Sequence, residues 1–256
     1  MSNVEKNLND LVTLSNNLGI KENDFVIMGE GNTSARADNE TFFVKASGTQ
    51  LETIKNDQFV RLYFDKILSL LDAENIAGTE LDEIYNNAKF DKDQALKPSV
   101  ETLFHAVCLS YDDINFVGHT HPTAINVLTC SKGYPENLSG RMYPDEIVVL
   151  GKESVFIPYI DPGVTLAKTI KEKIDNYIDE FNESPKVIYM QNHGLIALGA
   201  TAKEVENITK TAVKAARVRF GAIALGGIKL LSKDVIEHIA RRPDEIYRKK
   251  LFKQQG

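Results

Sequence analysis

Two apolar segments near residue 190 are joined by a connection of only two residues. The segment VIYMQ covers 187–191 and GLIALG covers 194–199, with Asn192 and His193 between them. Parallel neighbours in a sheet need a crossover of about a dozen residues or more, so such a short connection favours antiparallel pairing. Several other β-rich segments also follow one another too closely for helical crossovers. We therefore expect a sheet that is mainly antiparallel or mixed.

Helical patterns alternate with the β-rich segments along the chain. Apolar residues spaced three or four apart indicate helices, whereas short β-branched and aromatic runs indicate strands. The predicted helices cover 4–18, 99–110, 164–181, 201–225 and 232–240. The predicted strands cover 41–46, 58–64, 114–119, 145–150, 154–157, 187–191 and 194–199, and the polar stretch 70–97 is expected to hold short helical pieces at most. No Pro-, Gly- or Ser-rich linker or internal repeat interrupts this order, which predicts a single α/β domain over residues 1–256.

Charge and cysteine content restrict the partners that this chain can have. The formal net charge is -6 and the isoelectric point is near 5.5, which argues against nucleic acid as the main partner. Cys108 and Cys130 are far apart and form no CxxC pattern, so neither a disulfide framework nor a cysteine-rich zinc module is expected. The sequence shows no signal peptide and no apolar run long enough to span a membrane. We expect a cytoplasmic protein.

Three of the five histidines occur in patterned positions. His119 and His121 are two residues apart, and in an extended segment this spacing places both imidazoles on the same face. His193 lies between two apolar β segments, beside Gly194. Three neutral imidazoles with one open position form a common catalytic zinc site. Spacing alone leaves a second interpretation open, in which the pair is incidental and His193 is a hydrogen-bonding turn residue.

Two glycine-containing turns and one helix start add polar groups that can hold an anion. GEGNTS (29–34) and ASGT (46–49) expose backbone N–H groups, and Ser99 stands where a helix begins. Neither turn matches a P-loop or GxGxxG motif, so ordinary loop chemistry remains an alternative. Glu101 follows Ser99 and is either part of a helix cap or a general acid/base. His105, further along the same helix, is expected to pack or to support the site.

Five segments, taken in order, resemble the class II aldolase/adducin family. They are GEGNTSAR, KASGTQL, KPSVETLFHAV, VGHTHPTA and QNHGLIALG, and together they extend over most of the chain. Each motif alone is weak, but the ordered set raises the metal interpretation above the incidental one. The PSVET and PYIDPG segments are most similar to family modules that occur fused to a dehydrogenase.

The resemblance implies a fold, a metal site and a set of roles. The implied fold is a three-layer α/β/α sandwich with a mainly antiparallel central sheet, usually assembled as a homotetramer. The implied zinc ligands are His119, His121 and His193, although another divalent metal can take the place of zinc. Glu101 is the implied acid/base. The implied phosphate-binding residues are Asn32, Ser47, Gly48 and Ser99.

The implied activity is zinc-dependent cleavage of a small ketose phosphate by a class II aldolase. This retro-aldol reaction gives dihydroxyacetone phosphate and an aldehyde through a metal-stabilised enediolate. Alternatives on the same scaffold are a sugar-phosphate 4-epimerase, a sugar-acid phosphate decarboxylase and a non-catalytic adducin-like module. Val100 stands where the family has a second phosphate-binding serine, which weakens the expectation of a phosphorylated substrate. Family aldolases use a tyrosine to protonate the leaving aldehyde; Tyr134, Tyr143 and Tyr159 are the candidates after His121, and Tyr143 is the one selected.

Overall fold

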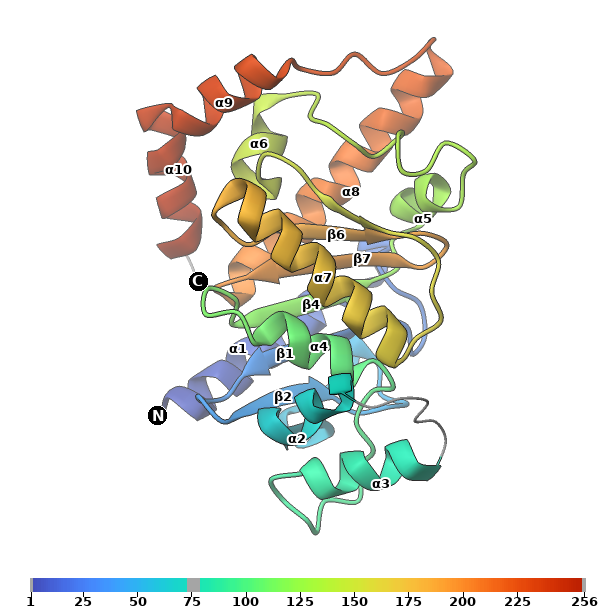
Figure 1. Ribbon diagram of the computed structural model, residues 1–256, viewed down its shortest axis with the longest axis vertical. Coiled ribbons are helices and arrows are strands. Elements are labelled where there is room, and N and C mark those ends of the chain that lie inside the picture. The colour runs from blue at the N-terminus through green and yellow to red at the C-terminus, as the bar shows by residue number, and fades with distance from the viewer. Residues whose placement is uncertain (1, 73–78, 255–256) are drawn as a thin grey trace.

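A mixed sheet runs through the middle of the protein (Figure 1). The computed structural model describes residues 2–72 and 79–254. Within these residues the sheet has seven strands in the order β3-β2-β1-β4-β7-β6-β5. The strands are β1 (Asn32–Arg36), β2 (Thr41–Lys45), β3 (Phe59–Tyr63), β4 (Phe116–Thr120), β5 (Val155–Ile157), β6 (Val187–Met190) and β7 (Gly194–Gly199). Only the β5–β6 pair is parallel, so the prediction of a mainly antiparallel sheet is confirmed.

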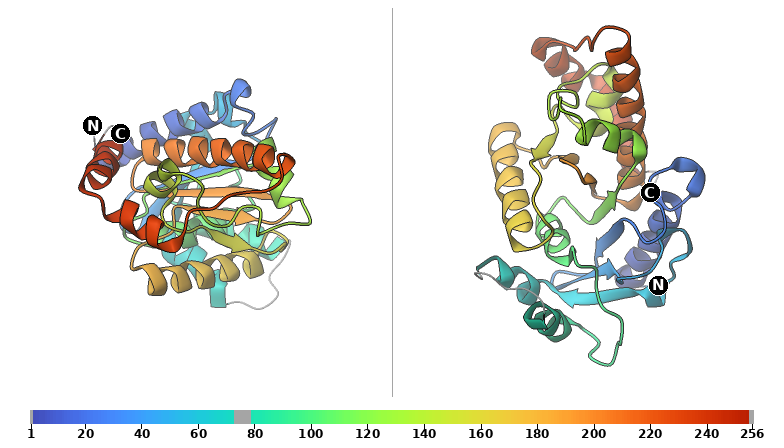
Figure 2. Two further views of the ribbon diagram at one scale, coloured as in Figure 1. Left: turned by 90° about the horizontal axis from the view of Figure 1, so that it is seen from above. Right: turned by 90° about the vertical axis from the view of Figure 1, so that its right-hand side faces the viewer.

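Helices cover both faces of the sheet, which confirms the predicted three-layer sandwich (Figure 2, left). One face is covered by α2 (Phe64–Leu68), α3 (Thr79–Ala88), α4 (Thr102–Leu109) and α7 (Val164–Phe181). The other is covered by α1 (Asn3–Leu18), α5 (Thr123–Thr129) and α8 (Ala202–Ala224). A further group, α6 (Pro144–Leu150), α9 (Lys233–Arg241) and α10 (Pro243–Gln254), packs together beside α8.

The two cores arise from the alternation of side chains along each strand. On β2, Phe42 and Val44 enter the core beneath α4 and α7, while Phe43 enters the core beneath α1 and α8. On β4, Val117 enters the core beneath α4 and α7, and Phe116 enters the core beneath α1 and α8. Because helices cover both faces, these strands are apolar on both sides, as buried strands usually are.

Most predicted elements are present, and one is wrong. Helix α7 covers the predicted range 164–181, and the other predicted helices and strands lie within a few residues of their expected bounds. Residues 145–150 were expected to form a strand but belong to α6. Pro144 in the first turn, followed by Asp145 and Glu146, favours a helix start, and this outweighs the β-branched run after it.

The region 70–97 contains a longer helix than expected. Helix α3 has ten residues, whereas only short helical pieces were predicted there, and residues 73–78 lie outside the described part of the chain. The predicted helix at 99–110 begins later, at Thr102. Among the residues that the structure describes, no helix has the length and apolar character that a membrane crossing requires.

Candidate metal centre

Three histidines come together at one end of the central strands of the sheet. His119 lies on β4, His121 follows the end of that strand, and His193 occupies the turn between β6 and β7. Their ligand atoms all lie within 4.8 Å of one another, and Nε2 of His119 is 2.9 Å from Nε2 of His121. Among the described residues this is the group that could hold a metal ion.

The close approach of the start of β7 to β4 depends on Gly194. A Cβ atom at this position would lie 2.5 Å from the carbonyl oxygen of Thr120 and 2.7 Å from Cδ2 of His121. Any side chain would therefore push the β6–β7 turn away from β4. The glycine that follows His193 thus keeps its imidazole near the other two.

The three rings fit a divalent metal. Nδ1 of His119 is 2.9 Å from the carbonyl oxygen of Leu195 and donates to it in the tautomer that leaves the Nε2 lone pair facing the other histidines. Burial lowers the pKa of His119, and it lowers the pKa of His121 to about 3, so both rings are neutral near pH 7 as metal ligands must be. A tetrahedral zinc ion keeps its nitrogen ligands roughly 3.3 Å apart, which lies within the spread of distances in this cluster.

Glu101 points its carboxylate into the histidine cluster. Its Oε2 is 3.4 Å from Nε2 of His119, and its Oε1 is 3.3 Å from Nε2 of His193. The carboxylate is buried, and Oε1 accepts no hydrogen bond from the described residues. A buried carboxylate oxygen without a donor, directed at imidazole lone pairs, is what a bound cation would satisfy.

The ionisation of Glu101 reflects opposing effects. Burial raises the pKa of this carboxyl, whereas His119, His193 and the side-chain amide of Asn32 lower it, and the net shift is downward. Nδ2 of Asn32 donates to Oε2 of Glu101 at 2.7 Å. The carboxylate is therefore ionised at neutral pH.

The capping interpretation of Glu101 is wrong. Glu101 occupies the N-cap position of α4, but its side chain makes no capping hydrogen bond. The carbonyl oxygen of Ser99 instead accepts hydrogen bonds from the backbone N–H and the hydroxyl of Thr102. The start of the helix is satisfied without Glu101, which leaves the carboxylate free to face the histidines.

Asn32 and His105 hold the carboxylate in place. Asn32 is paired with His119 across β1 and β4, so the two side chains lie on the same face of the sheet. Its Oδ1 contacts Nε2 of the fully buried His105, and Nδ1 of that ring is 2.6 Å from the Ser34 hydroxyl. Burial lowers the pKa of His105 to about 3, so this ring is neutral. The predicted supporting role of His105 matches these contacts.

The expected phosphate-binding residues fall into two groups. Asn32 and Ser99 are buried and bonded to each other, with 3.1 Å between Nδ2 and Oγ. Ser47 and Gly48 are exposed in the turn after β2, where Gly48 has a φ of 79°. Backbone hydrogen bonds join the two segments. The Ser47 N–H donates to the carbonyl oxygen of Lys97, and the Ser99 N–H donates to the carbonyl oxygen of Lys45. Val100, beside them, is 66% exposed.

Sequence reasoning missed Lys45 as a residue of this region. Its side chain is buried, and Nζ donates to the carbonyl oxygen of Gly29 at 3.3 Å. Burial lowers the pKa of Lys45 to about 8, although the nearby charge of Glu101 acts in the opposite direction. The available signal was a lysine directly before the ASGT turn, preceded by the apolar run FFV (42–44).

The three candidate tyrosines occupy different environments. The hydroxyl of Tyr134 donates to the carbonyl oxygens of Ile157 and Tyr189, which ties it to the sheet. Tyr143 begins α6, where Lys214 of α8 lies 5.6 Å from the centre of its ring. Tyr159 is 58% exposed, and its backbone N–H donates to the side chain of Gln191, two residues before His193. The hydroxyl of Tyr159 itself donates to the carboxylate of Asp161 at 2.7 Å.

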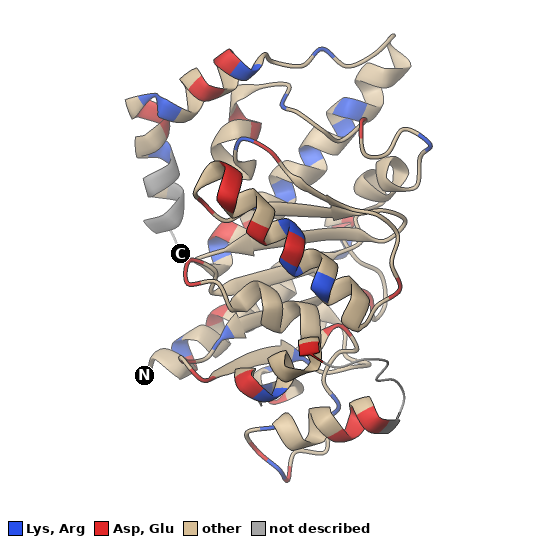
Figure 3. Cartoon of the chain, in the orientation of Figure 1, with Lys and Arg blue, Asp and Glu red and all other residues tan. Residues whose placement is uncertain are grey.

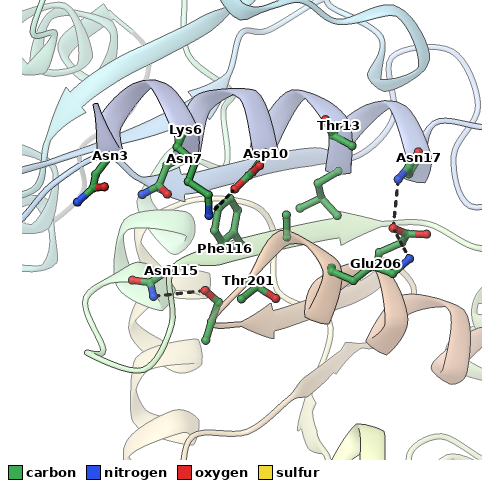
Figure 4. Close-up of a pocket in the computed structure, with 14 residues that line it drawn as sticks. Asn3, Lys6, Asn7, Asp10, Thr13, Asn17, Asn115, Phe116, Thr201 and Glu206 are labelled. Atoms are coloured by element: carbon green, nitrogen blue, oxygen red, sulfur yellow. Dashed lines mark hydrogen bonds and ion pairs between the residues drawn. The ribbon is translucent and has the colours of Figure 1, made fainter. Parts of the chain in front are cut away.

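A separate hollow of about 510 Å³ lies between α1 and the beginning of α8 (Figure 4). Its lining combines polar side chains, with Asn17 bonded to Glu206 at 3.1 Å, and apolar ones such as Phe116 at the start of β4. His119 and His121 lie at the other end of that strand. This hollow is therefore distinct from the histidine cluster.

The comparison with protein families identifies the group to which this chain belongs. Residues 9–220 match the family described as Class II Aldolase and Adducin N-terminal domain. The chain belongs to this family. The predicted resemblance is therefore confirmed, and the motifs that carried it contain the histidines and Glu101 described above.

Three curated relatives carry different activities in their names. The uncharacterized oxidoreductase YuxG of Bacillus subtilis is 31% identical over 206 residues, which cover 77% of this chain but only 27% of YuxG. The chain thus spans about a quarter of that relative. The 3-oxo-tetronate 4-phosphate decarboxylase of Haemophilus influenzae is 25% identical over 78% of this chain and 80% of its own length. The methylthioribulose-1-phosphate dehydratase of Geobacillus kaustophilus is 28% identical over 80% of this chain and 87% of its own length.

Solved structures share the fold. The N-terminal class II aldolase domain of a conserved protein from Thermoplasma acidophilum has a TM-score of 0.66 and 26% identity, over 83% of this chain and 93% of that one. An L-fuculose 1-phosphate aldolase has a TM-score of 0.67 and 18% identity, over 92% of this chain and 94% of that one. At 18% identity the second comparison describes the fold alone.

Proposed function

We propose that this chain is a metal-dependent lyase that cleaves a small ketose phosphate by a retro-aldol reaction. The products are dihydroxyacetone phosphate and an aldehyde. The observation that carries the proposal is the position of the Glu101 carboxylate, 3.3 and 3.4 Å from Nε2 of His193 and His119, respectively. A metal held by three neutral imidazoles would have an ionised carboxylate beside it, and this pairing suits proton transfer next to a carbonyl.

In this proposal His119, His121 and His193 hold zinc or another divalent ion. When bound, the ion supplies a Lewis acid that withdraws electrons from the substrate carbonyl. Glu101 carries a proton to and from the carbon that the cleaved bond leaves behind. Asn32 keeps that carboxylate ionised and oriented, because its amide donates to Oε2 at 2.7 Å.

The phosphate of the substrate is assigned to Asn32, Ser47, Gly48 and Ser99. Support comes from the turn after β2, where Ser47 and Gly48 are exposed and the Gly48 N–H donates to no group among the described residues. An exposed turn of this kind can offer its amide to an anion. Asn32 and Ser99 already contact Glu101, so they would join the phosphate to the acid/base.

A decarboxylase is the second candidate. A relative named 3-oxo-tetronate 4-phosphate decarboxylase aligns with 78% of this chain, and one named methylthioribulose-1-phosphate dehydratase aligns with 80%. Decarboxylation next to a carbonyl leaves the same kind of electron-rich carbon as retro-aldol cleavage does, so the same metal and Glu101 can serve it. An adducin-like module without chemistry is disfavoured, because all three histidines and Glu101 are present and converge.

A product assay separates these reactions. The metal-loaded protein is mixed with ketose 1-phosphates and with sugar-acid phosphates, and NADH oxidation by coupled glycerol-3-phosphate dehydrogenase reports dihydroxyacetone phosphate. The proposal expects NADH oxidation with at least one ketose 1-phosphate and its loss in Glu101→Gln. Release of carbon dioxide, loss of water or formation of an epimer, with no triose phosphate from any substrate, would show that the retro-aldol assignment is wrong. Proton NMR identifies those products in the same samples.

We also propose that the chain forms a single cytoplasmic domain and assembles as a homotetramer. Large apolar side chains that remain exposed support assembly, among them Met28 at 81%, Phe220 at 58% and Leu225 at 91%. Light scattering coupled to size-exclusion chromatography tests this, since a tetramer has four times the 28.6 kDa chain mass. A monomer at micromolar concentration would contradict the assembly.

A further inference from the structure

The hollow between α1 and the beginning of α8 has the dimensions of a small-molecule site (Figure 4). Its volume of about 510 Å³ falls within the roughly 300–1,000 Å³ that is usual for such sites. One wall is a single face of α1, formed by residues three or four positions apart: Asn3, Asn7, Asp10, Leu14 and Asn17. The turn before α8 and the first residues of that helix form the opposite wall. Two helices therefore frame an opening that a small molecule can enter.

Side-chain amides are the main polar groups of the hollow. Three belong to the asparagines of α1, and a fourth comes from Asn115, just before β4. The Nδ2 atoms of Asn7, Asn17 and Asn115 donate to groups of the protein, at 2.8, 3.1 and 3.4 Å, respectively. No described residue donates to the Oδ1 atoms of these three, and the Asn3 side chain makes no hydrogen bond with the described residues. The hollow therefore offers amide oxygens and a free amide donor to a ligand.

The charges that line the hollow balance one another. Lysines and acidic residues both lie on the two helices that flank it, whereas the strands carry few charges (Figure 3). Nζ of Lys6 is 3.5 Å from Asp10, and Nζ of Lys203 is 3.2 Å from Glu206. Each lysine of the lining thus has an acidic partner that also lines the hollow. Because the lining has no net charge to attract an ion, it favours a neutral ligand.

An apolar surface lies beside these polar groups. Leu14 and Phe116 belong to the core beneath α1 and α8 and also line the hollow, together with Ala200 and Ala202. A sugar or another polyol combines hydroxyl groups, which both donate and accept hydrogen bonds, with C–H groups that pack against apolar side chains. The amides and the apolar surface of this hollow match both parts of such a molecule.

We propose that the hollow binds a neutral polyhydroxylated molecule, such as a sugar without a phosphate group. The hydroxyl groups of the ligand bond to the asparagine amides, and its C–H groups lie against Leu14 and Phe116. The metal centre is at the other end of β4, because Phe116 begins this strand and His119 lies near its end. The inference does not rest on the proposed function, since it concerns a different site and can be measured without turnover.

Ligand-observed NMR on the metal-loaded protein tests this inference. The probes are D-glucose, L-fucose and myo-inositol at millimolar concentration, and saturation transfer from the protein to at least one of them is expected. Thr13→Phe places a ring in the hollow and should abolish the transfer. Thr13 is exposed, and its hydroxyl donates to the carbonyl oxygen of Asn9 on the same helix, so the substitution should leave the fold intact.

Thr169→Phe is the matched control for this variant. Thr169 also donates its hydroxyl to a carbonyl oxygen one turn back, that of Thr165, at 3.0 Å. It lies on α7, which covers the opposite face of the sheet, so Thr169→Phe should bind the probes as the wild type does.

A second variant removes amides instead of filling the space. Asn3→Ala/Asn115→Ala should weaken the affinity for the best probe by about 5- to 150-fold in an NMR titration, the range for two neutral hydrogen bonds. Asn16→Ala is its control, because Asn16 is on α1 but bonds to the carbonyl oxygens of Leu51 and Ile54 outside the hollow.

Wild-type affinity in both Thr13→Phe and Asn3→Ala/Asn115→Ala would overturn the inference. Equal losses in these variants and their controls, or no transfer to any probe, would overturn it as well. His193→Ala should bind the probes as the wild type does, and loss of binding in this variant would place the sugar on the metal instead. If no ketose phosphate is cleaved while the hollow variants behave as expected, the proposed function fails and the sugar site stands.

Discussion

Replacing Asn32 with alanine removes the donor that holds the Glu101 carboxylate. The lost contacts are a 2.7 Å hydrogen bond to ionised Oε2, a 3.1 Å bond to the Ser99 hydroxyl and a short contact with Nε2 of His105. A hydrogen bond to a charged group contributes about 1.5–3 kcal/mol and a neutral one about 0.5–1.5 kcal/mol. We expect the free energy of unfolding of the metal-free protein to fall by about 2–4 kcal/mol at pH 7.

The sign of the pH dependence follows from the pKa of Glu101. The Asn32 amide helps to hold this pKa below its ordinary value, so the stability it contributes is present above the unfolded-state pKa and is lost as the pH falls through the folded-state pKa. In Asn32→Ala the folded-state pKa rises. The stability gap between the two proteins is therefore constant near neutral pH and shrinks once the pH falls below the pKa of Glu101 in the variant.

Guanidinium unfolding of both proteins, from neutral pH down to the acid pH at which Glu101 is protonated in the variant, measures this gap. Asn16→Ala is the control, because Asn16 donates to the carbonyl oxygens of Leu51 and Ile54 rather than to a carboxylate. Its destabilisation should not change with pH. A gap for Asn32→Ala that does not shrink once Glu101 is protonated in the variant would refute the claim that Asn32 stabilises an ionised Glu101.

Three further changes test other parts of the site. Gly194→Ala should weaken zinc binding by about tenfold or more and lower stability by about 1–3 kcal/mol in chemical unfolding, because its Cβ would meet the His121 ring at 2.7 Å. Gly221→Ala, in the last turn of α8 where an added Cβ meets nothing within 4 Å, should instead stabilise by about 0.5–1 kcal/mol. Glu101→Gln should retain bound metal in elemental analysis but lower kcat by about 10²- to 10⁴-fold; an unchanged kcat would remove Glu101 from proton transfer. Tyr159→Phe should lower kcat for retro-aldol cleavage without changing zinc affinity, and equal kcat values would exclude it as the donor.

Local patterns were sufficient for most of the fold. Helix α7 has an amphipathic pattern with Asp161-Pro162-Gly163 before it, and its bounds were predicted without error. The two-residue connection at 192–193 indicated the antiparallel pairing of β6 with β7. The failure at 145–150 has a physical reason: Ile147 and Val148 favour strands locally, but both are buried in α6 and its starting residues favour a helix.

The residues of the site were predictable from the sequence, but the contacts between their side chains were not. Spacing and family motifs indicated the three histidines and Glu101, and the structure brings these four together. The contact of Asn32 with Glu101 depends on the register of β1 against β4, which nothing in the local sequence specifies. Lys45 was missed for the same reason, because its burial arises from packing between distant segments.

Calorimetric titration of zinc into the metal-free protein tests the three-histidine centre most directly. The account predicts one ion per chain for the wild type and an affinity about 100-fold lower or worse for His193→Ala. His238→Ala is the control, because His238 is an exposed residue of α9 and its replacement should leave the affinity unchanged. Absence of saturable binding by the wild type, or equal affinities for the wild type and His193→Ala, would contradict the assignment.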